Sequence, residues 1–125
     1  MFSHVMVGAD DIDQSKNFYD AVLRTIGVNP GYLAPDGRVF YMTPGGNFAL
    51  TKPIDGGGAS HANGGTIGFV MASAEQAKAW HDAGVANGGS FIEDPPGIRQ
   101  GAAGQMYLAY LRDPDGNKIV GLCRL

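Results

Sequence analysis

The sequence contains an internal repeat, which constrains the fold of a chain more than any single motif does. One shift along the chain places residues 18–21 (Phe-Tyr-Asp-Ala) on residues 80–83 (Trp-His-Asp-Ala). The same shift places residues 4–7 (His-Val-Met-Val) on residues 66–69 (Thr-Ile-Gly-Phe). Because both matches occur in one register, we predict that the chain is built from two copies of one structural module.

Each copy shows the signals of a helix at the same relative place. Asp11 with Gln14, and Ser73 with Gln76, each combine an N-cap residue with a glutamine three positions later, the pattern of a capping box. Apolar residues then recur with the helical period until glycine ends the pattern, at Gly27 in the first copy. A helix therefore follows the first strand of each copy.

Short apolar runs separated by turn sequences follow each helix, and we interpret them as strands. They cover residues 39–42 and 48–51 in the first copy, and residues 90–93, 105–112 and 118–123 in the second. The order is therefore βαβββ in each copy. It predicts an α+β fold with two four-stranded mixed sheets, outer helices and a cleft between the sheets.

The same pattern divides the chain into module one (residues 1–53), a linker (residues 54–64) and module two (residues 65–125). The linker is polar and glycine-rich, so we expect it to be flexible and without packing contacts. Residues 94–104 are too rich in glycine and proline to predict a strand or helix. Such a long loop suggests a function, and we expect a mobile lid whose Arg99 binds an anionic group of a ligand.

Composition excludes several classes of protein. The chain has 125 residues, a net charge of −3 and nine scattered lysines and arginines, so we expect no nucleic-acid partner. No apolar stretch approaches the roughly 20 residues that span a bilayer, so we expect no membrane partner. Cys123 is the single cysteine, which we expect to be buried and inert. Together with a start that lacks a secretory signal, it suggests a cytoplasmic protein.

Four stretches of the chain carry a family resemblance. They are His4-Val5 at a strand start, residues 15–27 on the first helix, residues 65–69, and residues 112–119 (Arg-Asp-Pro-Asp-Gly-Asn-Lys-Ile). With these features the sequence resembles the vicinal oxygen chelate superfamily, which includes glyoxalase I, bleomycin resistance proteins and extradiol dioxygenases. The resemblance implies that the paired βαβββ modules curl into an open, cup-shaped barrel around one cleft.

The resemblance also implies where a metal would bind. In metal-dependent members the ligands lie on the first and last strands of each module, at positions that correspond to His4, Ala49, Thr66 and Val120. Ala49 and Val120 have no donor atom, and the Thr66 hydroxyl is a poor ligand for zinc, nickel or iron. A catalytic metal takes about three protein ligands. We therefore expect no metal cofactor, with a divalent metal as the alternative.

Two functions remain open. The first is binding of a small aromatic or anionic molecule in the cup, as in bleomycin resistance proteins. The second is a glyoxalase-like lyase, isomerase or dioxygenase, in which His4 acts with a metal or as a general base.

Tyr107 and Tyr110 have opposite strand parity, so at most one faces the cup. We also expect a homodimer, because an open sheet edge favours self-association. The candidate ligand-binding residues are Met6, Phe40, Met42, Phe48, Thr66, Arg99 and Tyr107.

Overall fold

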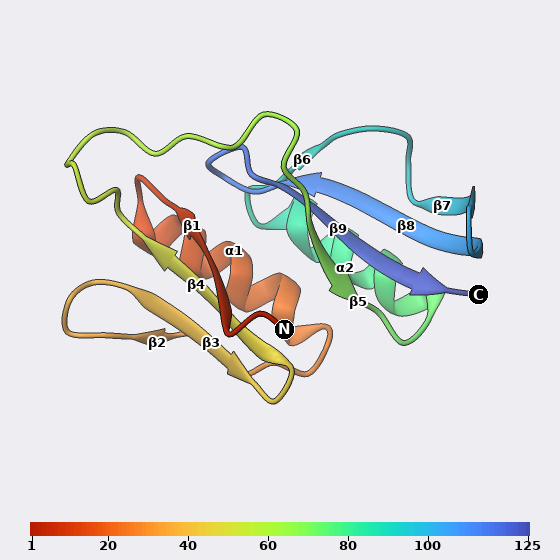
Figure 1. Cartoon of the computed structure of the whole chain (residues 1–125), viewed down its shortest axis with the longest axis horizontal. Helices are drawn as coiled ribbons and strands as arrows, with labels where there is room; N and C mark the ends of the chain where they lie inside the picture. The colour runs from red at the N-terminus through yellow and green to blue at the C-terminus, as the bar shows by residue number, and fades with distance from the viewer.

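The structure is a computed structural model that describes residues 1–125. Two helices and nine strands follow one another along the chain (Figure 1). In order they are β1 (His4–Gly8), α1 (Ile12–Arg24), β2 (Tyr32–Leu33), β3 (Val39–Thr43), β4 (Gly46–Thr51), β5 (Ile67–Val70), α2 (Ala74–Ala86), β6 (Ser90–Phe91), β7 (Gly97–Gly101), β8 (Gly104–Arg112) and β9 (Lys118–Arg124).

The strands form two mixed sheets, one from each copy of the repeat. The first has the order β1-β4-β3-β2, with β1 parallel to β4. The second has the order β5-β9-β8-β6, with β5 parallel to β9 and with β7 added against β8. The predicted α+β class with two repeated units is therefore confirmed. The second sheet has five strands rather than the predicted four.

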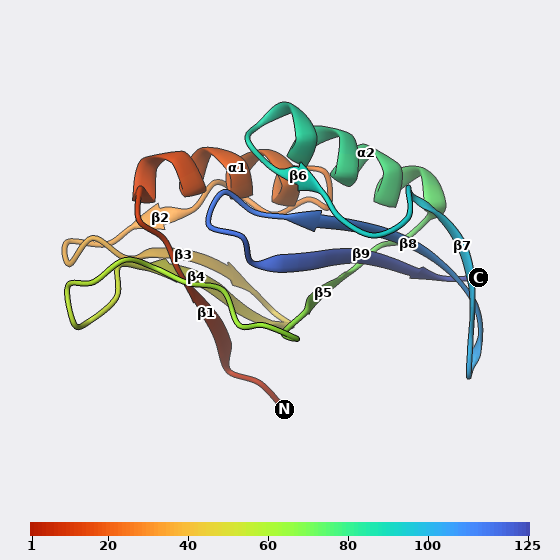
Figure 2. The same cartoon turned by 90° about the horizontal axis from the view of Figure 1, so that it is seen from above.

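Both helices lie on the same side of the two sheets, as Figure 2 shows. The core fills the space between the helices and the sheets, and its largest fully buried side chains include Tyr19 on α1 and Trp80 on α2. The other face of each sheet is not covered by a helix, and the sheets do not close on each other, as expected for an open cup. Neither helix is long and apolar enough to cross a bilayer.

The predicted N-caps are present on both helices. The Asp11 side chain accepts a hydrogen bond from the Gln14 backbone N–H at 3.0 Å, and Ser73 Oγ accepts one from the Gln76 backbone N–H at 3.1 Å. In a capping box the Gln76 side chain would accept a hydrogen bond from the backbone N–H of Ser73. Here its Oε1 accepts from the backbone N–H of Ala72, one residue earlier. The two capped starts fix where each helix leaves its sheet.

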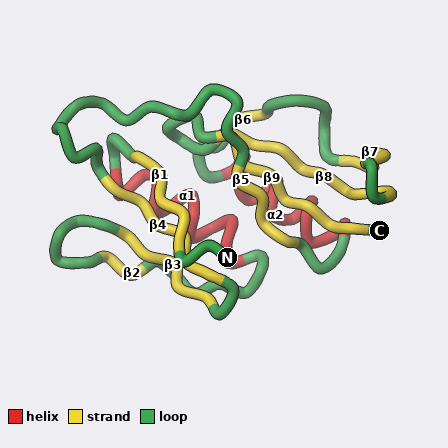
Figure 3. The backbone as a smooth tube through the Cα atoms, in the orientation of Figure 1, coloured by secondary structure: helices red, strands yellow, loops and turns green.

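The prediction of an irregular loop over residues 94–104 is wrong. Residues Gly97–Gly101 form β7, which pairs with the first half of β8 across a two-residue turn (Figure 3). Gly104, at the end of that turn, has a φ of +120°, a backbone conformation that favours glycine. Backbone pairing to β8 needs no apolar pattern on β7, so composition alone gave no sign of this strand.

The linker between the modules also differs from its expectation, because it makes tertiary contacts. The Ala59 backbone N–H donates a hydrogen bond to Asp10 Oδ1 at 2.6 Å. Further along, the exposed His61 lies so close to Gly116 that a Cβ atom at Gly116 would come within 2.9 Å of its Nδ1. The linker therefore rests on the end of β1 and on the turn between β8 and β9.

A buried polar network joins the two modules. The Tyr19 hydroxyl of α1 donates to Asp113 Oδ2 at 2.7 Å, and Asn117 Nδ2 donates to the same oxygen at 2.9 Å. In the same turn, Asp115 Oδ2 accepts from Ser15 Oγ at 2.9 Å. Because these bonds run from α1 of one module to the β8–β9 turn of the other, they fix how the two sheets are placed.

Candidate ligand-binding cleft

A mainly apolar cleft of about 440 Å³ lies between the two modules. β1 and β4 line one side, β5 lines the other, and Leu23 of α1 and Ile26, two residues after its end, also contribute. A cavity of similar volume beside Arg38 is lined mainly by polar residues. Since small-molecule sites are concave, mostly apolar and about 300–1,000 Å³ in volume, the cleft between the modules is the candidate functional site.

A chain of aromatic rings connects the cleft to the core. Phe48 on β4 and Phe69 on β5 line the cleft, and their ring centroids lie 5.5 Å apart at an interplanar angle of 74°. Phe69 in turn lies 6.1 Å from Trp80, which is fully buried. A ligand in the cleft would therefore contact aromatic rings from both modules. The Phe69 ring would separate it from Trp80, the only tryptophan of the chain.

His4 supplies an imidazole to the rim of the cleft. Its Nδ1 lies 2.8 Å from Ser3 Oγ, and its strand neighbour in the register is Asn47, which also lines the cleft. The contact through Nδ1 orients the ring and leaves Nε2 for a ligand. His4 and Asn47 thus place hydrogen-bonding groups at one end of an apolar space.

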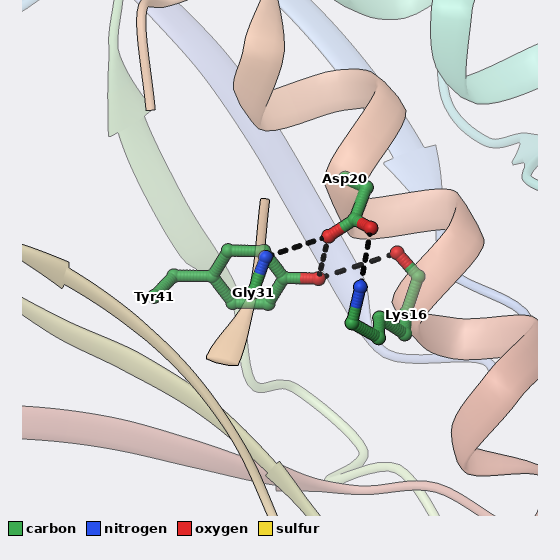
Figure 4. Close-up of polar contacts among 4 residues, drawn as sticks. All are labelled: Lys16, Asp20, Gly31 and Tyr41. Carbon is green, nitrogen blue, oxygen red and sulfur yellow. Dashed lines mark hydrogen bonds and ion pairs between the residues drawn. The ribbon is translucent and has the colours of Figure 1, made fainter. Parts of the chain in front are cut away.

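Tyr41, another cleft residue, is held rigidly by a polar cluster at its hydroxyl end (Figure 4). The Tyr41 hydroxyl donates to Asp20 Oδ1 at 2.8 Å, and the Gly31 N–H donates to the same oxygen at 2.8 Å. Lys16 Nζ donates to Asp20 Oδ2 at 2.7 Å. The cluster fixes the Tyr41 ring as a wall of the cleft and also anchors the segment before β2.

Burial and hydrogen bonding shift the pKa values of this cluster in opposite directions. Burial alone would raise the pKa of Asp20, but the bonds from Gly31, Lys16 and Tyr41 outweigh it, and the pKa of this carboxyl is lowered. Burial and the neighbouring Asp20 raise the pKa of Tyr41. At neutral pH, Asp20 is therefore an anion that accepts a hydrogen bond from a neutral phenol.

Three predicted ligand-binding residues share a surface with His4. In the first sheet, Asn47 of β4 pairs with His4 on one side and with Met42 on the other. Ala49 pairs with Met6 and Phe40 in the same way. Since alternate residues of a strand face the same side, Met6, Phe40 and Met42 lie with His4 on the open face of the first sheet. They adjoin the cleft but do not line it. Their role as ligand contacts stays a prediction.

The other predicted residues lie in three different places. Phe48 lines the cleft and also belongs to the core. Tyr107 pairs with the buried Cys123 and packs against the core on the helix-covered face, so Tyr110 is the tyrosine on the open face. Thr66 is exposed and precedes β5. The expected burial of Cys123 is confirmed.

The expectation that Arg99 belongs to a mobile lid is wrong. Arg99 lies on β7, and its Nη2 donates to the Pro95 carbonyl at 2.7 Å. β7 belongs to the sheet edge away from β5, whereas the cleft lies on the β5 side of that sheet. Because β7 is paired along its whole length with β8, the segment has no free chain with which to cover the cleft.

The residues at the metal-ligand positions implied by the family resemblance do not fit a metal. Ala49 and Val120 are buried and have no donor atom, which leaves His4 and the hydroxyl of Thr66. The structure also brings together no group of three or more histidine, cysteine, aspartate or glutamate side chains that could hold a metal ion. A metal-dependent reaction at these positions therefore has too few ligands.

Apart from Phe48, the apolar lining residues of the cleft were not predicted from the sequence, although the internal repeat relates two of them. Val5 and Ile67 occupy equivalent positions of the internal repeat, and both line the cleft. They belong to the helix-covered side of their sheets, where we expected core residues rather than ligand contacts. The cleft forms because β1 and β5 are sheet edges that do not pair with each other, so part of the core side is open between them.

Comparisons with known proteins agree with this architecture. A family profile described as the Glyoxalase/Bleomycin resistance protein/Dioxygenase superfamily matches residues 1–120. A crystal structure of a glyoxalase/bleomycin resistance protein from Albidiferax ferrireducens T118 is 57% identical, with a TM-score of 0.96 over 99% of each chain. A comparison with curated proteins finds no match.

More distant structures share the fold alone. A glyoxalase-related enzyme from Fulvimarina pelagi is 20% identical, with a TM-score of 0.73 over 98% of this chain and 86% of that one. A glyoxalase/bleomycin resistance protein/dioxygenase family enzyme from Burkholderia phytofirmans PsJN is 17% identical, with a TM-score of 0.73 over 98% of each chain.

Proposed function

Because the chain belongs to the Glyoxalase/Bleomycin resistance protein/Dioxygenase superfamily, we propose that it binds a small aromatic molecule in the cleft between its two modules, without a catalytic metal. The observation that carries this proposal is the cleft itself, which has aromatic walls and hydrogen-bonding groups at one end. The poor metal-ligand set at the family positions supports binding without a metal.

The lining of the cleft favours a neutral ligand. Phe48 and Phe69 offer ring faces and edges for an aromatic group. His4 and Asn47 supply a donor and an acceptor for one polar substituent. No lysine or arginine lines the cleft, and the anion clamp expected from Arg99 lies on another sheet edge. The ligand is therefore a compact aromatic molecule with a hydroxyl or a similar group.

Equilibrium dialysis with two matched probes tests this proposal. We expect neutral 2-naphthol to bind and anionic 2-naphthoate to bind more weakly. Phe69 lines the cleft and is only partly buried, so Phe69→Ala removes a ring from the cleft wall. We expect this variant to weaken 2-naphthol at least about tenfold, the loss of about 1.4 kcal/mol.

The control variant is Tyr32→Ala, which removes an exposed aromatic ring on β2, outside the cleft. It should leave the affinity for 2-naphthol unchanged. Equal affinity in wild type and Phe69→Ala would contradict binding in the cleft. Elemental analysis of the purified protein tests the second half of the proposal, and one tightly bound metal ion per chain would contradict it.

An enzymatic role for His4 is the second candidate, and one observation favours it. In the tautomer whose Nδ1–H donates to Ser3 Oγ, Nε2 of His4 carries the lone pair that would accept a proton from a ligand at the rim of the cleft. The proposed reaction class is proton abstraction without a metal. Exchange of a bound ligand's acidic hydrogen for deuterium in D2O, lost in His4→Ala, would support it. Exchange at the same rate in both proteins would contradict it.

We also propose that the chain forms a homodimer through its open sheet faces. Met42 and Val70 are 65% and 84% exposed, an unusual position for large apolar side chains unless a partner covers them. Light scattering should therefore return twice the chain mass of 13.1 kDa. A particle of 13.1 kDa at micromolar concentration would contradict the dimer.

A further inference from the structure

A second cavity lies outside the cleft and is lined by residues of α2, β6, β8 and the connection from β6 to β7. Its volume is about 440 Å³, which is within the range of small-molecule sites. The imidazole of His81 and the phenol of Tyr107 line it, with Phe91, Pro95 and Pro96 as apolar walls. The proposed function uses none of these five residues.

His81 is the polar group that makes this cavity unusual. Only 4% of its side chain is exposed, and its Nδ1 lies 3.9 Å from Asp82 Oδ1, too far for a hydrogen bond. The Tyr110 backbone carbonyl is the other polar group beside the ring. Burial lowers the pKa of His81, although Asp82 partly opposes the effect, so the ring is neutral at pH 7. A neutral imidazole offers one donor and one acceptor nitrogen.

The apolar walls of the cavity are formed by one aromatic ring and two proline rings. The Phe91 ring lies 5.3 Å from the His81 ring at an angle of 54°, and 69% of Phe91 is exposed. Pro95 and Pro96 present two further rings from the β6–β7 connection. Such surfaces favour a planar ring, because aromatic groups gain stacking energy beyond the area that they bury.

The charges around the cavity balance each other. Lys78 and Asp82 line its rim, and their side chains form an ion pair with an Nζ–Oδ2 distance of 2.7 Å. An anionic ligand would approach Asp82, and a cationic ligand would approach Lys78, so neither has a clear electrostatic advantage. A neutral ligand avoids both repulsions.

From these observations we propose that this cavity is a second binding site, for a small neutral aromatic molecule that carries a hydroxyl group. The ring of the ligand packs against Phe91 and the two prolines. Its hydroxyl donates to the imidazole nitrogen of His81 that does not face the Tyr110 carbonyl, and it accepts from the hydroxyl of Tyr107. This site is independent of the cleft between the modules, because no residue lines both.

Phenol is the probe that tests the second site, and the three histidines of the chain report where it binds. Long-range 1H–15N spectra of the imidazole rings should show a saturable shift of His81 as phenol is added. His4 reports on the cleft and His61 on the linker, so they serve as internal controls. Cyclohexanol has the same hydroxyl but no planar ring, and it should shift His81 at least about tenfold more weakly.

Phe91→Ala removes the exposed ring without disturbing the core, and it should weaken the phenol-dependent shift of His81 at least fivefold. Ile54→Ala, which truncates a fully exposed linker residue, is the matched control and should have no effect. The proposal would be overturned if phenol shifted His81 equally in Phe91→Ala and in wild type. It would also be overturned if cyclohexanol shifted His81 as strongly as phenol does. A His81 ring that phenol does not shift would overturn it as well, whether or not His4 responds.

Discussion

At the scale of single residues, Asp20 connects the stability of the cleft wall to pH. Its carboxylate accepts hydrogen bonds from Gly31, Lys16 and Tyr41, and these bonds lower its pKa below the ordinary value of 3.8. A carboxyl whose pKa is lower in the folded chain stabilises the fold above its unfolded pKa. That stabilisation is lost as the pH falls through the folded pKa.

We therefore expect the difference in unfolding free energy between wild type and Asp20→Asn to depend on pH. It should be constant and largest above about pH 5 and should shrink below about pH 4. Denaturant unfolding at a series of pH values measures it. Asp36→Asn, which removes a half-exposed surface ion pair with Arg38, is the control and should show a much smaller effect. A difference that grows on acidification would contradict the assigned pKa direction.

Gly31 gives a second prediction at the same scale. A Cβ atom at this position would lie 2.5 Å from Val39 Cγ1 and 2.7 Å from Tyr41 Cζ, both closer than side chains tolerate. Gly31→Ala should therefore destabilise the fold by about 1–3 kcal/mol, the usual cost of overpacking. Gly58→Ala, with nothing nearer than 3.9 Å, should change the free energy of unfolding by much less in the same denaturant titration.

At the scale of elements, the start of α2 joins the two modules. Ser73 Oγ caps the helix through the Gln76 N–H, and Gln76 Nε2 donates to the Thr25 carbonyl at the end of α1. Local capping and contact between the helices therefore depend on the same short segment. The cap was predicted from the repeat. The contact to Thr25 depends on how the two copies pack, so no local sequence pattern predicts it.

Ser73→Ala should cost about 0.5–2 kcal/mol of stability, the usual worth of an N-cap. The control is Ser60→Ala in the exposed linker, which removes a hydroxyl of the same kind away from any helix start. Thermal or denaturant unfolding measures both. An equal effect of the two substitutions would show that the cap of α2 contributes nothing specific.

The elements also show which features can be predicted from the sequence. Both helices and the paired sheets follow from signals that repeat within the chain, such as Asp11 and Ser73 at the helix starts. β7 was missed because its pairing with β8 uses backbone groups that any residue provides. The lining residues Ile67 and Phe69 were not predicted, because strand parity shows only which residues share a face of the sheet. It does not show that the core-facing side is open at the edge of this sheet.

At the scale of the whole molecule, the Tyr19–Asp113 bond determines how the modules sit on each other. Tyr19 belongs to α1, whereas Asp113 belongs to the turn between β8 and β9, and both are almost fully buried. Tyr19→Phe removes one hydroxyl and leaves the carboxylate with its bonds from Asn117 and the Asp115 N–H. The substitution therefore tests the joint between the modules without emptying the core.

We expect Tyr19→Phe to cost about 1.5–3 kcal/mol, the range for a hydrogen bond to a charged group. Tyr110→Phe, on the open face of the second sheet, is the control and should cost much less. Denaturant unfolding measures both. A loss in Tyr19→Phe no larger than that in Tyr110→Phe would contradict a stabilising role for this bond.

Binding in the cleft between the modules is the central claim, and one NMR measurement tests it directly. In protein with 13C-labelled methyl groups, unlabelled 2-naphthol should give intermolecular NOEs to Val5, Ile26 and Ile67, which line the cleft from both sheets and from the segment after α1. NOEs confined to Val120, on the open face of the second sheet, or to residues of the second cavity would contradict it.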